Sequence, residues 1–193
     1  VVTGGASGIG FGIVTALLEE GAAAVALLDI EAGALEDAVE RLRGADLGGH
    51  VIGLTCDVTD PTSVEAAAAA AWDELGSVQV VCLNAGVFAG GAVWETTEAD
   101  WDWVLGVNVR GVINGIRAFV PQLIEAGDPA HVLITASIAG IVAAPASGVY
   151  CTSKCAAVGP LREGDFPARA DSRRRAILTT VTSATYSAGF SAA

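Results

Sequence analysis

The chain has 193 residues, of which 52% are hydrophobic and 17% are charged, so it is long and apolar enough to fold as one globular domain. Acidic residues outnumber basic ones 22 to 10, and the formal charge of −12 argues against partners such as nucleic acids or anionic membrane surfaces. The two histidines are isolated and the four cysteines form no Cys-x-x-Cys pair, so no metal site is expected.

The cysteines and the uncharged stretches indicate in which compartment the protein is expected. We expect four buried free thiols in a reducing cytoplasm, at Cys56, Cys82, Cys151 and Cys155. Three uncharged stretches, 1–18, 75–94 and 132–153, are broken by glycine, asparagine or proline and predict no membrane helix. The chain opens on a strand-like Val1-Val2 without methionine, so we expect its true N-terminus to be missing.

Short β-branched runs alternate with alanine-rich segments of helical length. In chain order the expected elements are a strand ending at 1–2, a helix over 9–20, a strand over 24–28, a helix over 31–43, a strand over 50–55, a helix over 61–75, a strand over 78–83, a helix over 97–126, a strand over 131–136 and a helix from about 149. This alternation predicts an α/β fold: one Rossmann-like domain with a doubly wound parallel sheet and helices on both faces.

The pattern changes after residue 157. Gly159-Pro160 and Pro167 interrupt any helix there, and an arginine cluster at 173–175 precedes a run that reads as a strand over 176–182. We therefore divide the domain into a dinucleotide-binding and catalytic core, residues 1–157, and an atypical C-terminal segment, residues 158–193, expected to be incomplete or irregular.

A glycine-rich turn, TGGASGIG at residues 3–10, lies between the first strand and the first helix. Glycines there permit a tight turn and let a pyrophosphate approach the N-terminus of the helix. By itself such a segment is as often an ordinary turn as a dinucleotide site. The candidate cofactor contacts in it are Gly4, Ser7, Gly8, Ile9 and Gly10.

Asp29 ends the second expected strand, where a carboxylate can accept hydrogen bonds from the diol of an adenosine ribose. The alternative is that Asp29 caps the following helix. A 2′-phosphate would meet like charge at Asp29 and no basic residue at Ser7 or Ile30, so NAD is favoured over NADP as the cofactor.

Two further loops leave the same edge of the sheet. Asp57-Val58 follows the third expected strand and Asn84-Ala85-Gly86 the fourth, at the carboxyl ends where open parallel sheets bind ligands. Taken singly, each is also an ordinary turn sequence. Trp94, Trp101 and Trp103 cluster after the fourth strand and either wall an apolar pocket or, as we favour, pack a helix against the sheet.

Tyr150 and Lys154 are four residues apart on an expected helix, so both side chains lie on one face. An ammonium beside a phenol favours its ionised form, which makes a general base feasible at neutral pH. A surface Tyr–Lys pair is the alternative. Ser137 lies thirteen residues before Tyr150 at the end of the fifth strand, where its hydroxyl could hold a substrate oxygen.

Together, TGGASGIG, Asp29, Asp57-Val58, Asn84-Ala85-Gly86, Asn108, Ser137 and the YCTSK sequence of residues 150–154 resemble the short-chain dehydrogenases/reductases, from residue 1 to about 157. The resemblance implies that Tyr150 is the acid/base, that Lys154 assists it and holds the nicotinamide ribose, and that Ser137 orients the substrate oxygen. It also implies that Asn108 supports a helix bend and a water in the proton relay. It places the remaining residues around NAD: Ser7 and Ile9 at the pyrophosphate, Asp57 and Val58 at the adenine, and Asn84, Ala85 and Gly86 at the adenosine ribose.

The resemblance thus implies an NAD-dependent oxidoreductase that interconverts a small secondary alcohol and a ketone, assembled as a homodimer or homotetramer. After residue 157 the chain departs from the family pattern, with no Pro-Gly after the last expected strand. The alternative is therefore a protein that binds NAD and is catalytically silent. If residues 160–193 are irregular, AMP or ADP-ribose should compete with NAD almost as well as NADH does.

Overall fold

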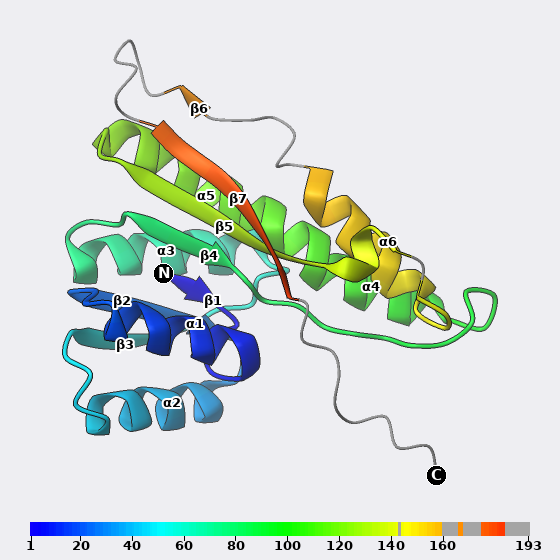
Figure 1. Ribbon diagram of the computed structural model, residues 1–193, viewed down its shortest axis with the longest axis horizontal. Helices are drawn as coiled ribbons and strands as arrows, with labels where there is room; N and C mark the ends of the chain where they lie inside the picture. Colours follow the sequence, from blue (N-terminus) through cyan, green and yellow to red (C-terminus); the bar gives the residue numbers. More distant parts are fainter. Residues whose placement is uncertain (143, 160–165, 168–174, 184–193) are drawn as a thin grey trace.

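A parallel sheet forms the centre of the structure, a computed structural model that describes residues 1–142, 144–159, 166–167 and 175–183 (Figure 1). Its strands are β1 (Val2–Thr3), β2 (Ala24–Asp29), β3 (His50–Thr55), β4 (Val80–Leu83), β5 (Ala130–Ser137), β6 (Phe166–Pro167) and β7 (Arg175–Ser183). They lie in the order β3-β2-β1-β4-β5-β7-β6, and only the β6–β7 pair is antiparallel. The fold is the doubly wound, Rossmann-like α/β architecture that the sequence predicts.

Helices cover both faces of this sheet (Figure 1). They are α1 (Gly8–Glu19), α2 (Ala32–Gly44), α3 (Pro61–Leu75), α4 (Glu98–Leu105), the π-helical turn η1 (Gly106–Arg110), α5 (Gly111–Ala126), the 3-10 turn η2 (Ile138–Gly140) and α6 (Gly148–Val158). Side chains of α1 and α2 form one apolar core with the sheet, and those of α3, α5 and α6 form another.

Strand β2 shows how one segment serves both cores. Val25 and Leu27 face α1 and α2, whereas Ala26 and Leu28 face the other layer, and all four are buried. A strand covered on both faces has no polar side to alternate with, which explains its continuous apolar sequence. The last residue of the strand, Asp29, can be polar because the strand leaves the core there.

Local signals fix where the helices begin and end. The side chain of Asp60 accepts a hydrogen bond from the Thr62 N–H at 2.9 Å, Pro61 starts α3, and Gly76 ends it with a φ of +69°. Thr97 and Asp100 form a reciprocal capping box at the start of α4. Caps of this type are visible in sequence, which is why most expected boundaries fall within two residues of those observed.

The expected single helix over 97–126 is corrected by the structure. The segment is helical throughout, but the π-helical turn η1 separates α4 from α5. A π turn needs no special composition, and periodicity over so short a stretch does not reveal it. The turn contains Asn108, whose buried side chain binds Val87 in the neighbouring loop rather than facing solvent.

The C-terminal strand is also present. Strand β7 pairs in parallel with β5 from Ala130↔Ala176 to Ser137↔Ser183, close to the strand expected over 176–182. The expectation of an irregular segment is therefore wrong for residues 175–183. The expectations at Pro160 and at most of the arginine cluster fall outside the described residues, and the division of the domain at residue 157 stays a prediction.

Candidate active site

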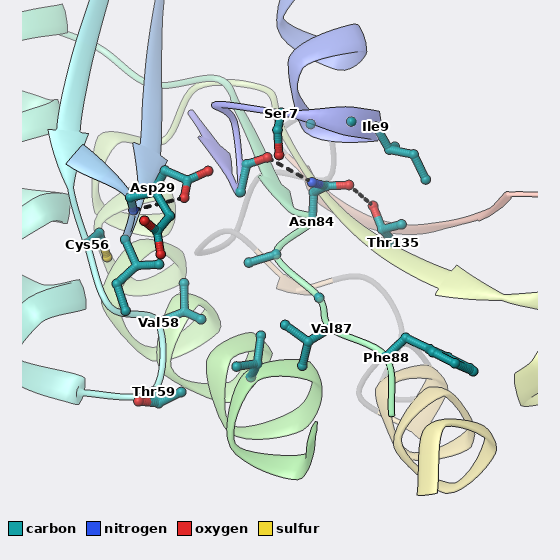
Figure 2. Close-up of a pocket in the computed structure, with 18 of the residues that line it drawn as sticks. Ser7, Ile9, Asp29, Cys56, Val58, Thr59, Asn84, Val87, Phe88 and Thr135 are labelled. Carbon is teal, nitrogen blue, oxygen red and sulfur yellow. Dashed lines mark hydrogen bonds between the residues drawn. The ribbon is translucent and has the colours of Figure 1, made fainter. Parts of the chain in front are cut away.

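A cavity of about 670 Å³ opens at the carboxyl ends of the parallel strands (Figure 2). This volume is in the range of small-molecule sites. The cavity brings together thirteen of the fifteen residues singled out in the sequence: Gly4, Ser7, Gly8, Ile9, Gly10, Asp29, Asp57, Val58, Asn84, Ala85, Gly86, Tyr150 and Lys154. Asn108 and Ser137 are not part of its wall.

The glycine-rich turn is built for close approach. Gly4 has a φ of +63°, and a Cβ at Gly10 would overlap the carbonyl oxygen of Gly4, so the turn folds directly onto the first turn of α1. A Cβ at Gly8 would meet nothing within 4 Å, which leaves open space beside the helix N-terminus. Ser7, the N-cap residue, makes no side-chain cap hydrogen bond. The positive end of α1 is therefore available to an anionic group.

Asp29 joins the glycine-rich turn to the end of β2. Its Oδ2 accepts a hydrogen bond from the Ala6 N–H at 3.0 Å, and its Oδ1 accepts one from the Glu31 N–H at 3.3 Å. The N-cap of α2 is Glu31, so the alternative reading of Asp29 as that cap is not what the structure has. Each carboxylate oxygen keeps acceptor capacity toward the cavity.

The loop after β3 is held by contacts within the loop and by residues of α5. Asp57 Oδ1 accepts hydrogen bonds from both the N–H and the hydroxyl of Thr59, each at 2.8 Å. Nδ2 of Asn114 donates to the Val58 carbonyl oxygen at 2.9 Å, and a Cβ at Gly111 would come within 2.9 Å of the Val58 side chain. Contacts with α5 thus hold Val58 in its position at the cavity wall.

Asn84 is a buried link between strands. Its Nδ2 donates to the carbonyl oxygen of Thr3 at 3.1 Å. Its Oδ1 accepts from the hydroxyl of Thr135 at 3.0 Å, as Figure 2 shows. The Thr3 hydroxyl in turn accepts from the Asn84 N–H at 2.9 Å and donates to the Cys82 carbonyl oxygen at 3.4 Å. These bonds fix β1 against β4 where the cavity floor begins.

Tyr150 and Lys154 face the cavity from α6. Lys154 Nζ lies 5.7 Å from the centre of the Tyr150 ring and donates to the Thr135 carbonyl oxygen at 2.9 Å. Lys154 is only 4% exposed, and this burial lowers the pKa of its ammonium below the ordinary value. On the other side, the Phe88 ring packs edge-on against Tyr150, with centroids 5.1 Å apart. The surface-pair alternative does not fit a buried lysine.

Asn108 and Ser137 are buried and lie outside the cavity wall. Asn108 Oδ1 accepts from the Val87 N–H at 2.8 Å, and its Nδ2 donates to the Val87 carbonyl and to Ser153 Oγ, both at 2.9 Å. Ser153 Oγ donates to the Tyr150 carbonyl oxygen at 2.7 Å. Buried Ser137 accepts from the Ala139 N–H at 3.2 Å and caps η2. Its role toward a substrate oxygen stays a prediction.

Comparison with known proteins identifies the family. The family model described as short chain dehydrogenase matches residues 1–171. The chain belongs to the short-chain dehydrogenase/reductase family.

Two curated relatives illustrate the match. The chain is 37% identical over 164 residues to a "C alpha-dehydrogenase" of Sphingobium sp. (84% of this chain, 52% of the relative). It is 39% identical over 186 residues to a "1-deoxy-11-beta-hydroxypentalenate dehydrogenase" of Streptomyces arenae (94% and 64%). The chain therefore spans 52% and 64% of the length of these relatives.

Solved structures of family members superpose on this fold. A short-chain dehydrogenase/reductase from Burkholderia phymatum in complex with NAD matches with a TM-score of 0.82 and 36% identity, covering 94% of this chain and 62% of that one. NAD+-bound xylitol dehydrogenase matches with a TM-score of 0.79 and 31% identity, covering 84% and 61%.

Sequence reasoning about this family member missed several residues of the site. Thr135 contributes a carbonyl to Lys154 and a hydroxyl to Asn84, and Asn114 holds the Val58 loop. Thr135 reaches Lys154 across 19 residues and Asn84 across 51, and Asn114 reaches Val58 across 56, so no local pattern signals these contacts. An asparagine on the apolar face of a helix was the one available signal, because a buried amide needs partners.

The three tryptophans do not all pack against the sheet as favoured. Trp94 is 86% exposed, and Trp103 is half exposed and lines the cavity. Trp101 is half-buried, and its Nε1 donates to the Thr96 hydroxyl at 3.1 Å. The pocket-wall alternative thus fits Trp103.

The cysteines are free, but only two of them are buried as expected. Cys56 and Cys82 lie in the interior, where burial raises the pKa of each thiol, whereas Cys151 is half-buried and Cys155 is exposed. The buried face of α6 is formed by Val149, Ser153, Lys154 and Ala157, and Cys151 and Cys155 do not belong to it. Over the described ranges there is no cluster of three potential metal ligands, and none of the helices is long and apolar enough to span a bilayer.

Proposed function

We propose that this family member binds NAD and interconverts a small secondary alcohol and the corresponding ketone. The observation that carries the proposal is one cavity with two chemically different ends. A glycine-rich helix N-terminus and Asp29 lie at one end, and the buried Lys154 beside Tyr150 lies at the other.

The residues present fit a dinucleotide. The open space at Gly8 and the uncapped first turn of α1 suit a pyrophosphate, because backbone N–H groups and the helix dipole both favour an anion there. A Cβ at Gly86 would come within 3.3 Å of Lys154 Nζ and of Asn108 Oδ1, so the floor beneath the Tyr150 end admits no larger side chain. Asp29 would accept from the ribose diol, and Val58 would lie against the adenine.

NAD(H), when bound, supplies the hydride acceptor or donor. The side chains of the protein would orient the cofactor and the substrate and transfer the proton. Tyr150 Oη would take the hydroxyl proton during alcohol oxidation and return it during ketone reduction. Lys154 would place a positive charge beside the phenol oxygen, because its carbonyl bond to Thr135 and its burial restrict where the ammonium can lie. Ser137 would hold the substrate oxygen, and Asn108 would keep Val87 and α6 in register.

Binding and turnover measurements test the proposal separately. NADH binding is followed by its fluorescence, and turnover by absorbance with a panel of secondary alcohols. Binding together with turnover supports the proposal, whereas binding with no turnover by the wild-type protein supports the silent-binder alternative. The absence of NADH binding overturns both. Assembly as a homodimer or homotetramer is a separate prediction that light scattering checks.

A further inference from the structure

Large apolar side chains left exposed are concentrated on two segments. In the described part of the chain, seven of the nine exposed large hydrophobic residues lie within 88–103 or 138–142, and these are Phe88, Val93, Trp94, Trp103, Ile138, Ile141 and Val142. The other two, Ile9 and Ile30, line the dinucleotide end of the cavity. Single exposed apolar residues are ordinary, but a local group of them marks a binding surface.

Both segments are fastened to the helix that carries Tyr150. The Gly91 N–H donates to the Ala146 carbonyl oxygen at 2.8 Å, just before α6 begins. Val93 packs so closely on Gly148 that a Cβ there would overlap it. In the second segment, a Cβ at Gly140 would come within 2.8 Å of the Lys154 carbonyl oxygen. The two apolar segments therefore flank the Tyr150 end of the cavity and leave its dinucleotide end clear.

Phe88 is the apolar residue in direct contact with the reacting end. Its ring meets the Tyr150 ring at an interplanar angle of 66°, an edge-on geometry that aromatic pairs prefer. Phe88 is nevertheless 52% exposed and lines the cavity, as does Trp103 (Figure 2 shows Phe88 beside Val87). A group bound at Tyr150 would thus lie next to an aromatic surface that Tyr150 does not cover.

Charge is distributed unevenly along the same cavity. The acidic side chains in its described wall, Asp29, Glu31 and Asp57, all lie at the dinucleotide end. At the Tyr150 end the one charged group of the described wall is Lys154, which is buried and already bound to Thr135. Among the residues that the structure describes, a carboxylate or phosphate on a substrate would find no other cation there, and the net charge of −12 adds a repulsive field.

We propose that the substrate is uncharged and places an aromatic ring, or a similarly flat apolar group, against Phe88 beside its carbinol or carbonyl carbon. This inference rests on the proposed function for the position of the reacting carbon. It assigns Phe88 as the residue that determines specificity for the substituent.

A matched pair of ketones tests the charge preference. 4-Nitroacetophenone and 4-acetylbenzoate have nearly the same shape, but only the second is an anion. Their binding to the protein saturated with NAD⁺ is measured by calorimetry, where no turnover occurs. We expect the neutral ketone to bind more tightly by on the order of 10- to 100-fold. Equal binding, tighter binding of 4-acetylbenzoate, or no binding of either ketone would overturn the inference.

Variants at Phe88 test the residue. Phe88→Leu keeps an apolar side chain and removes the ring, so affinity for 4-nitroacetophenone should fall about tenfold. Phe88→Arg should reverse the preference in favour of 4-acetylbenzoate. The control is Ala69→Arg, which makes the same change in net charge on the exposed side of α3, outside the cavity. If Ala69→Arg reverses the preference as well, the effect is one of net charge and the assignment of Phe88 fails.

The outcomes separate this inference from the proposed function. NAD binding and ketone preference without turnover would refute the oxidoreductase proposal and leave the apolar subsite standing. Turnover of charged and neutral alcohols with equal kcat/KM would support the oxidoreductase proposal and refute the apolar subsite.

Discussion

The ammonium of Lys154 is buried and donates its hydrogen bond to the main-chain carbonyl oxygen of Thr135, 2.9 Å away. A carbonyl dipole compensates a charge only in part, which is why desolvation lowers the pKa of Lys154 below its ordinary value of 10.5. Strand β5 thus holds a charged group in a position that costs folding free energy, a common property of functional sites.

The pH dependence of stability should report this cost. Between the lowered folded pKa of Lys154 and 10.5 the unfolded chain binds more protons, so the free energy of unfolding gains a contribution that rises with pH. Lys154 is the only lysine in the chain. We expect Lys154→Met to remove that rise while abolishing most turnover. Urea unfolding of the cofactor-free protein between pH 7 and 10.5 measures it, and identical slopes for both proteins would contradict the assignment.

Tyr150→Phe tests proton transfer. The ring and its edge-on contact with Phe88 are kept and only the hydroxyl is lost, so NADH affinity should change little. Turnover should fall by about 10²- to 10⁴-fold, the usual loss when a general acid–base is removed. Stopped-flow or steady-state assays at saturating NAD check this result. Near-normal turnover in the variant would mean that another group moves the proton.

Cofactor choice should depend on Asp29 and its neighbour. Ile30 is 56% exposed and lines the cavity beside the carboxylate. The double variant Asp29→Ala, Ile30→Arg removes the negative charge and adds a cation, so preference should move toward NADP by at least about tenfold. Because Asp29 also accepts from the Ala6 N–H, Asp29→Asn serves as the control that retains most of the side-chain shape. Tighter binding of NADPH than of NADH by the wild type would refute the ribose role.

Asn114 should act on the adenine half of the site alone. Asn114→Leu leaves the carbonyl oxygen of Val58 without its amide donor, so ADP-ribose and NAD should bind about tenfold more weakly. The kcat at saturating NAD should stay close to wild type, since Asn114 contacts neither Tyr150 nor Lys154. Gln122→Leu removes an amide from the same helix that bonds only to Ala118 of its own turn. Equal loss of affinity in both variants would point to general destabilisation of α5.

A structural feature can be predicted from the sequence when the residues that cause it lie close together in the chain. The glycine-rich turn, the Asp60 cap and the Tyr150–Lys154 spacing are short-range features: Asp60 caps α3 as the sequence predicts, and the turn and the Tyr150–Lys154 pair line the cavity. The partners of buried amides are different, because Asn114 meets Val58 only after the sheet has brought two layers together. For the same reason, the close contact of Phe88 with Tyr150 depends on a loop path that no periodicity describes.

The π-helical turn η1 constrains how many residues the chain can have between α4 and α5. A π turn accommodates one residue more than an α-helical turn, and each residue of an α-helix advances the direction of the next by about 100°. Asn108 in this turn points to Val87, while Asn114 one and a half turns later points to Val58. The extra residue sets the phase between these two directions. Deleting Val109 or Arg110 would let at most one asparagine keep its partner, so the spacing here is constrained independently of residue identity.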